Sequence, residues 1–325
     1  MPNIWTHLLF GQEALTTSGL AHWLNTPAHK QLFNMGCQGP DFLFYHKFFP
    51  WQRNKTMNRL GSEMHAKHCG PVLIDLLDAA QYRKRETCVY MLGFVLHHIL
   101  DRHMHPYVFV RSGFRKWDHQ RFEILMDTQI VQRKLGLETW QTPVWTEIDT
   151  NGTFPEEVVD AFEKVTHKYY PELAYDVERK YWNEANRDMI RAQKLFHDPR
   201  GIKRVLTFGQ IEPMMYKREV PPYDVLNETH RAWPDPTGTG DTYTTSIWDM
   251  WEEAAKDAAR VLSATLHYWE TRHAWEHGTT DHIVTRVDVD ESLAQLRAAV
   301  GNRSYETGLP VEYNRPIRVE DPIWL

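Results

Sequence analysis

The chain has 325 residues, of which 42% are hydrophobic and 25% charged, so it can bury a large core as one domain or as two closely packed ones. Its formal net charge of -6 at pH 7 excludes a general electrostatic attraction to long nucleic acids or anionic lipids, although a local basic patch is compatible with this balance. Three cysteines, an odd number and too few for a disulfide framework, indicate reduced thiols.

The hydropathy of the chain and its N-terminal stretch indicate a cellular location. No run approaches the ~18 consecutive apolar residues of a membrane-spanning helix. The opening sequence, MPNIWTHLLFGQEAL, contains neither a basic leader nor a cleavable apolar segment. We therefore expect a cytoplasmic protein without a transmembrane segment. The sequence carries no signal for an oligomeric state.

The first two predicted helices lead to a turn that holds a candidate catalytic carboxylate. Residues 4–20 have apolar residues at helical intervals, with His7 on the apolar side, where a packing or capping role is the simpler explanation of His7 taken alone. A second short helix is predicted over residues 28–34. The glycines and proline of NMGCQGPD then break the helix and hold Asp41 in an irregular turn, for which an Asx turn or a helix cap is an equally good explanation. His46 is a further candidate ligand.

A third predicted helix carries two more histidines. Residues 60–76 are apolar at helical spacing, and His65 and His68 fall within them. Because these two residues are three apart, at most one of them faces a shared cavity, and the other lies toward its rim.

The stretch from residue 93 to residue 127 carries the strongest signal in the chain. Two sets of ionisable residues repeat there at intervals of four, which brings side chains to one helical face. They are His97, Asp101, His105, His119, Glu123 and Asp127. Pro106 is predicted to end the first helix, so that the second folds back antiparallel and presents its residues to the same cavity. Imidazole and carboxylate groups arranged in this way can converge on a divalent metal.

The alternative is that these residues are ordinary core or surface groups, as a single histidine on an apolar helix usually is. Here the intervening positions are strongly apolar, so the ionisable residues point into or beside a core. A buried, unpaired carboxylate costs several kcal/mol, so its charge must be compensated. Metal ions and paired histidines are the available compensation, and the regular spacing therefore favours a metal site.

The rest of the chain also predicts helices. Pro155 stands in the first turn of one helix, and Pro171 begins a longer one. Ser246 caps an amphipathic helix that runs to about Glu270. Asp290 is predicted to cap a last short helix.

One long irregular segment and an extended tail complete the predicted organisation. Residues 212–245 are rich in Pro, Gly, Thr and aromatic residues, which is typical of a lid or a binding wall. The tail over residues 305–325 is predicted to be extended on the surface. No repeat and no alternating strand pattern occurs, so we predict an all-α fold. It forms one all-helical domain over residues 1–325, with its motif-bearing core at about 4–135.

Taken together, these residues resemble the zinc-dependent phospholipase C family, which includes bacterial phosphatidylcholine-hydrolysing enzymes and, more distantly, single-strand-specific zinc nucleases. The resemblance covers about residues 4–130 and implies a multi-helix bundle with a metal cluster in a cleft. Its most specific part is the Leu-Gly-x-x-x-His-x-x-x-Asp stretch at Gly93. The other matches are His7, the GPD turn at Asp41, His65, and His119 with Glu123.

The resemblance implies two or three zinc ions, and it implies their ligands position by position. One zinc would be held by Asp41, His65, His97 and Asp101. A second would share Asp101 and be bound by His7. The third would be held by His105, His119 and Glu123. The family counterpart of Asp41 is also the favoured general base.

The sequence departs from the family pattern at the N-terminus and at the choline site. In secreted members an N-terminal tryptophan contributes its amine and carbonyl to a zinc, whereas here His7 lies too close to Met1 for that arrangement. The zinc bound by His7 is therefore expected to be incomplete or completed by another group. Phe42 follows Asp41 as one choline-binding aromatic residue, but Ser62 stands where another is expected.

Two histidine ligands have alternatives in the sequence. The proline of the central motif stands one residue later than in the family, so His103 is an alternative to His105. His68 and His46 are alternatives to His65.

The site implies a phosphodiester hydrolase that uses a metal-activated water on a phospholipid or another small phosphodiester. All the candidate ligands are nitrogen or oxygen donors, which suits zinc and is also compatible with manganese or iron. A zinc nuclease or nucleotidase is the first alternative, although the acidic balance counts against long nucleic acids as substrates. A metal-binding relative that has lost turnover is the second.

Overall fold

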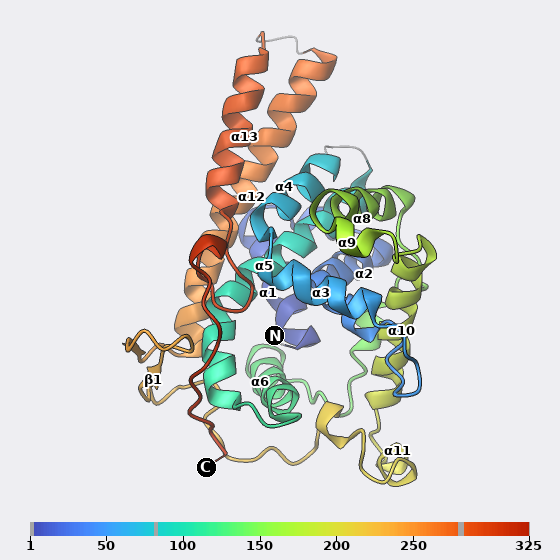
Figure 1. Cartoon of the computed structure of the whole chain (residues 1–325), viewed down its shortest axis with the longest axis vertical. Helices are drawn as coiled ribbons and strands as arrows, with labels where there is room; N and C mark the ends of the chain where they lie inside the picture. The colour runs from blue at the N-terminus through green and yellow to red at the C-terminus, as the bar shows by residue number, and fades with distance from the viewer. Residues whose placement is uncertain (1–2, 81–83, 279–282, 325) are drawn as a thin grey trace.

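Helix α5 (Arg85–Ser112) runs through the centre of the molecule, and six other α-helices pack against it (Figure 1). The computed structural model describes residues 3–80, 84–278 and 283–324. Most side chains of α5 are buried, because its apolar residues occur on every side rather than along one stripe. A helix of this kind is expected at the centre of a bundle.

The helices that contact α5 come from both halves of the chain. They are α1 (Ile4–Thr17), α2 (Pro27–Gly36), α4 (Cys69–Ala80), α6 (Asp118–Leu135), α8 (Glu156–Tyr169) and α12 (Ile247–His277). The other α-helices are α3 (Thr56–Ala66), α7 (Trp145–Ile148), α9 (Pro171–Ala174), α10 (Lys180–Phe196), α11 (Ile202–Leu206) and α13 (Arg286–Val300). Short 3-10 helices occur at η1 (Ala21–Leu24), η2 (Gly39–Tyr45), η3 (Glu212–Met214) and η4 (Val311–Tyr313).

Regular β-structure in the described part of the chain consists of one small hairpin and an isolated antiparallel bridge between Arg303 and Pro310. The hairpin strands, β1 (Trp233–Pro234) and β2 (Thr242–Tyr243), pair antiparallel within the long irregular segment. The predicted all-α fold is confirmed. None of the helices built from the described residues has the length and apolar character needed to cross a bilayer.

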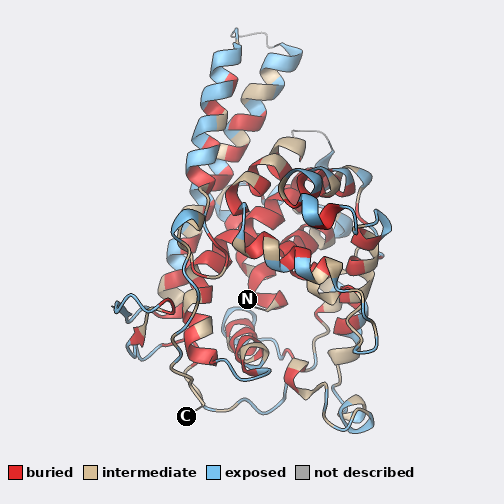
Figure 2. Ribbon diagram, viewed as in Figure 1, coloured by how far each residue is buried: buried red, intermediate tan, exposed pale blue. Residues whose placement is uncertain are grey.

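The buried side chains gather in the body of the molecule, whereas the distal ends of α12 and α13 project from it and are mostly exposed (Figures 1 and 2).

Both α12 and α13 begin with a side-chain cap. Ser246 caps α12 as predicted. It forms a capping box with Asp249, in which each side chain accepts a hydrogen bond from the other residue's backbone N–H group. The cap of α13 is Thr285, paired in the same way with Asp288, so the predicted cap at Asp290 is wrong.

The prediction that Pro106 ends its helix is also wrong, because α5 continues through it to the cap at Gly113. A proline inside a helix has no N–H to donate, so the carbonyl of Arg102 loses its usual partner one turn away. The backbone of Gly308, from the C-terminal tail, lies against that carbonyl. A Cβ at Gly308 would stand 2.3 Å from the Arg102 oxygen. The tail therefore covers the turn that the proline opens.

Two other predicted helices are each divided in the structure. The helix expected to begin at Pro171 is the single turn α9 followed by a separate α10. The helix predicted over residues 60–76 is divided into α3 and α4 at His68, which has a left-handed backbone with φ of 56°. In both places a local turn interrupts an apolar pattern that continues on either side.

Helices α2 and α5 approach closely because glycines face each other across their contact. A Cβ at Gly36 would stand 2.3 Å from the carbonyl oxygen of Tyr90, and one at Gly93 would stand 2.5 Å from that of Phe33. Any side chain at either glycine would separate the helices. The close contact brings the turn that follows α2, which carries Asp41, beside the middle of α5.

Candidate metal centre

The central helix α5 presents His97, Asp101 and His105 on one inward face. All three side chains are buried. The Nε2 of His97 lies 3.0 Å from Oδ2 of Asp101, and the Nδ1 of His105 lies 3.8 Å from the same oxygen. The spacing of four residues therefore brings these groups together as the sequence predicts.

Helix α1 adds His7 to this face. Its Nε2 lies 3.2 Å from Oδ1 of Asp101, and its ring stacks on that of His97 with centroids 4.1 Å apart. One ligand atom from each of His7, His97 and Asp101 lies within 4.8 Å of the other two, so these atoms are close enough to bind a single metal ion. Asp101 thus offers one oxygen toward α1 and the other toward its own helix.

The 3-10 helix η2 and helix α3 form a second group around His97. Oδ1 of Asp41 lies 3.1 Å from Nε2 of His65 and 3.8 Å from Nε2 of His97. Gly39 makes this approach feasible, because a Cβ there would stand 2.1 Å from Cδ2 of His97 and its backbone φ is 49°. Where an irregular turn was predicted at Asp41, the chain forms the 3-10 helix η2.

The third group forms where α6 turns back beside α5. Nε2 of His119 lies 2.6 Å from Oε1 of Glu123, and the rings of His105 and His119 have centroids 6.0 Å apart. Donor atoms of His105, His119 and Glu123 again lie within 4.8 Å of one another. The structure therefore brings all eight residues singled out in the sequence into three groups.

Backbone carbonyls fix the orientation of three of the imidazole rings. The Nδ1 groups of His65, His97 and His105 lie 2.7, 3.0 and 2.8 Å from the carbonyl oxygens of Gly61, Cys37 and Tyr305. A ring that donates its Nδ1 proton to a carbonyl keeps Nε2 unprotonated, as an acceptor or metal ligand requires, which is the usual arrangement around protein-bound zinc. These carbonyls hold the donors in position.

Tyr305 is a residue of this site that the sequence did not reveal. The tail was predicted to be extended on the surface, but Tyr305 is buried and its ring packs on His65 with centroids 4.9 Å apart. Its N–H donates to the carbonyl of His65, and its own carbonyl faces His105. The contact joins residues 200 positions apart through a backbone carbonyl, so no sequence motif marks it. The only signal in the sequence is an aromatic residue in a polar tail.

Burial keeps most of the imidazoles neutral. It lowers the pKa of His7 to about 4 and the pKa values of His105 and His119 well below the ordinary value. Burial also opposes the charge of His97, but Asp101 and Asp41 outweigh it and raise the pKa of His97. Neutral rings are the form that binds a metal, so the electrostatics suit a cation site.

Asp101 is the group whose charge most needs compensation. Burial alone would raise its pKa, yet His105, His97 and His7 hold that pKa well below the ordinary value, so the side chain is a carboxylate. Both of its oxygens, and the Nε2 of His105, are buried without a well-formed hydrogen bond within the described part of the chain. A divalent cation satisfies such atoms, and the nitrogen and oxygen donor set fits zinc.

The alternative histidines lie outside the three groups. His103 lies with Nε2 2.9 Å from Oδ2 of Asp257, and His46 lies 3.3 Å from Glu184. His68 is exposed and packs against Tyr169. The fold therefore favours His105 over His103 and His65 over the other two.

Asp127 continues the spacing of α6 but has a different role. Its carboxylate accepts hydrogen bonds from the backbone amides of Trp5 and Thr6, in the first turn of α1, and from the hydroxyl groups of Thr6 and Tyr216. A carboxylate at a helix N-terminus is favoured by the helix dipole. Asp127 therefore fixes the start of α1, which carries His7.

The pKa of Asp127 yields a prediction for the pH dependence of stability. Burial raises this pKa from 3.8 to about 6 in the folded protein, although the hydrogen bonds from Thr6 and Tyr216 oppose the rise. Between these two values the folded protein retains a proton that the unfolded chain has released. The free energy of unfolding therefore falls as the pH rises through this window, by about 3 kcal/mol in total, and is constant above it.

Urea unfolding of the wild type and of Asp127→Asn, both kept metal-free by a chelator, measures this effect. The variant does not titrate, so the wild type should lose about 3 kcal/mol relative to it between about pH 4 and pH 7. The metal ligands titrate equally in both proteins and cancel in the difference. Parallel stability curves over this range would show that the raised pKa of Asp127 is wrong.

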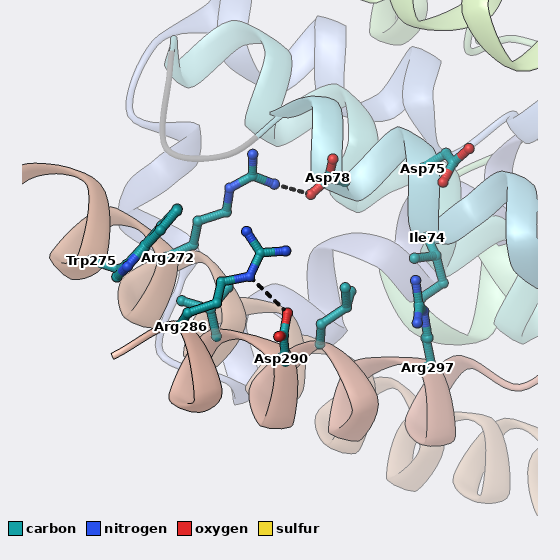
Figure 3. A pocket seen from close by; sticks show the side chains of 10 residues that line it. Ile74, Asp75, Asp78, Arg272, Trp275, Arg286, Asp290 and Arg297 are labelled. Carbon is teal, nitrogen blue, oxygen red and sulfur yellow. Dashed lines mark hydrogen bonds and ion pairs between the residues drawn. The ribbon is translucent and has the colours of Figure 1, made fainter. Parts of the chain in front are cut away.

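A cavity of about 240 Å³ between α4, α12 and α13 lies apart from this centre (Figure 3). Its walls carry both arginines and aspartates. Arg272 pairs with Asp78, and Nε of Arg286 lies 3.1 Å from Oδ1 of Asp290. None of the eight candidate ligands lines this cavity, and its charges are largely paired, so it is separate from the proposed chemistry.

Comparison with known proteins agrees with the geometry of the centre. The family model described as zinc-dependent phospholipase C matches residues 6–191, more than half of the chain. The match runs from α1 to the last part of α10 and includes all three groups of donors. Comparisons with curated proteins and with solved structures find no match. The chain belongs to the zinc-dependent phospholipase C family.

Proposed function

We propose that this protein is a zinc-dependent phosphodiester hydrolase of the phospholipase C type, which cleaves a phospholipid or another small phosphodiester. The observation that carries the proposal is the meeting of eight nitrogen and oxygen donors, from five separate elements, inside a chain of this family. Bringing so many imidazoles and carboxylates together in a core is costly unless cations compensate them. A catalytic metal cluster accounts for that arrangement.

The proposed ligands divide the work among three groups. They are His7 with His97 and Asp101, Asp41 with His65 and His97, and His105 with His119 and Glu123. When bound, zinc supplies the positive charge that activates a water molecule and neutralises the phosphate. The protein holds the donors rigidly, because carbonyls of distant segments orient the rings.

Asp41 is the proposed general base. It keeps 8% of its surface exposed, whereas Asp101 is completely buried, so Asp41 is the more accessible carboxylate for a water molecule. In the proposed reaction Asp41 takes a proton as the water oxygen bonds to phosphorus. The bond from phosphorus to the leaving alcohol oxygen breaks, and the departing oxygen takes up a proton, which leaves a phosphomonoester and an alcohol.

Recognition of a choline headgroup is not part of the proposal. Phe42 is completely buried, and its ring packs against Phe154, Phe162 and Trp182. It therefore has no free face to stack on a quaternary ammonium group. Ser62 offers no aromatic face either. The proposed substrate is defined by its diester group.

Replacement of His97 tests the proposed function, because His97 belongs to two of the three groups. We expect His97→Ala to lose at least one zinc ion per chain and to reduce hydrolysis of a chromogenic phosphodiester by roughly 1,000-fold or more. The matched control is His103→Ala, on the same helix but paired with Asp257, which should keep its zinc and its turnover. Less than one metal ion per wild-type chain, together with unchanged turnover in His97→Ala, would refute the proposal.

The choice of substrates separates the proposal from its two alternatives. Phospholipids with several headgroups, small diesters and single-stranded DNA should be compared at equal metal content. Preference for DNA would identify a nuclease, which the net charge of -6 disfavours. Zinc bound at all three groups without hydrolysis of any diester would identify a metal-binding relative without turnover.

A further inference from the structure

One short segment after α10 exposes an unusual number of apolar side chains. Four large apolar residues within seven positions point to solvent. They are Ile202, Val205, Leu206 and Phe208. Leu206 is 73% exposed and Phe208 is 92% exposed, so these two side chains bury little apolar surface in the folded chain. A contiguous exposed apolar patch of this kind is typical of an interaction site.

A second exposed segment lies against the same end of α10. Trp51 is 72% exposed and stacks on Phe49, which stacks on Phe48, with ring centroids 4.7 and 4.2 Å apart. Phe48 in turn contacts Phe196, the last residue of α10, at 6.5 Å. These aromatic rings form a continuous row from the end of α10 to solvent.

The segment after α10 is held in place rather than loosely attached. The ammonium group of Lys203 donates to the carbonyl oxygens of Lys194 and His197 at 2.6 and 2.8 Å, which ties α11 to the end of α10. Farther along, Tyr216 donates to Asp127 on α6. The chain between them therefore spans from α10 to the helix that carries His119 and Glu123.

The charge of the two segments is opposite to that of the whole chain. Residues 47–55 contain three basic residues and no acidic one, and residues 197–208 contain three basic residues against one acidic one, in a chain of net charge -6. Within the described contacts, the guanidinium groups of Arg53, Arg200 and Arg204 make no ion pair, and all three residues are exposed. This is the local basic patch that the overall composition allows.

We propose that residues 47–55 and 197–208 form one docking surface for an anionic phospholipid membrane. Exposed Leu, Phe and Trp side chains enter the boundary between headgroups and acyl chains, and neighbouring arginines bind the lipid phosphates. An apolar patch that met a second protein would not need this local excess of unpaired positive charge. Binding goes beyond the proposed hydrolysis, because it requires no turnover.

The connections of the docking surface relate it to the candidate metal centre. The 3-10 helix η2, which carries Asp41, leads directly into residues 47–55. Gln193, near the end of α10, donates to the hydroxyl of Tyr45 at the end of η2. A docked membrane would therefore lie at the C-terminal end of α10. At that end residues 47–55 connect directly to η2, which carries Asp41. This arrangement suits an enzyme whose substrate remains in the lipid surface.

Vesicle sedimentation with the purified, zinc-loaded full chain tests the docking surface. The probes are phosphatidylcholine vesicles with and without phosphatidylglycerol. We expect the wild type to bind the anionic vesicles, and Arg200→Gln/Arg204→Gln to weaken that binding roughly thirtyfold. Leu206→Ser/Phe208→Ser should weaken it by roughly tenfold or more. The matched control is Ile283→Ser, which changes an equally exposed apolar residue three positions before α13, and it should bind normally.

Several outcomes would overturn the docking surface without touching the proposed hydrolysis. Wild-type protein that binds neither kind of vesicle would do so, as would equal loss of binding in the Ile283 control. Self-association that disappears in Leu206→Ser/Phe208→Ser, without vesicle binding, would instead identify an interface between two copies of the chain. Turnover of a soluble phosphodiester should be equal in the wild type and in all these variants, which keeps the two proposals separate.

Discussion

Asp101→Asn is expected to remove zinc from the group that Asp101 forms with His7 and His97. It should reduce diester hydrolysis by roughly 1,000-fold or more. Oδ1 of Asp101 lies 3.2 Å from His7, and Oδ2 lies 3.0 Å from His97. Asparagine has nearly the same shape, but it replaces one donor oxygen by an NH₂ group and removes the charge that balances a cation. Zinc content by elemental analysis and turnover by a chromogenic diester measure the effect.

A matched control for this change is Asp257→Asn. Asp257 contacts Arg102 and His103, on the same central helix, but belongs to none of the three groups. Its replacement should lower thermal stability, because Arg102 is buried and loses its partner, while zinc content stays normal. Full zinc content and normal turnover in Asp101→Asn would show that Asp101 is not a zinc ligand.

Gly39→Ala is expected to release the metal ion that we propose is bound by Asp41, His65 and His97, and to reduce turnover by roughly 100-fold. The new Cβ would stand 2.1 Å from Cδ2 of His97, whose ring is held by the carbonyl of Cys37. The turn that carries Asp41 must then move away from α5. Zinc content and turnover, measured beside the melting temperature, report this displacement.

The control for Gly39→Ala separates the collision with His97 from backbone strain. Gly19 also has a left-handed backbone, with φ of 75°, but a Cβ there meets nothing within 4 Å. Gly19→Ala should therefore cost only about 1 kcal/mol of stability and keep its zinc and its turnover. If Gly39→Ala behaves in the same way as Gly19→Ala, the close approach of η2 to His97 has no part in metal binding.

The sequence predicted the core of the site because helical periodicity places residues four apart on one face. His97, Asp101 and His105 needed only a continuous helix, and α5 provides one. The proline beside His105 was misread as the end of that helix. The Arg102 carbonyl that loses its partner there is covered by the tail at Gly308, a contact that no local pattern records.

Other features depended on packing between distant segments and were not predictable. His103 and His105 lie on different faces of one helix, and only the position of Asp257 on α12 shows which of them is committed elsewhere. Asp127 fits the metal spacing on α6 but meets the first turn of α1. The carbonyl that orients His105 belongs to Tyr305. Because the backbone of any residue can make such a contact, no sequence pattern marks it.

Anomalous scattering from crystals at the zinc absorption edge, with elemental analysis of the same preparation, tests the central claim most directly. The account predicts zinc peaks within the three groups of donors, with Asp101 and His97 as ligands and with the ring of His105 facing an ion. Protein purified with zinc present that holds no ion at these residues, or holds zinc only elsewhere, would contradict it.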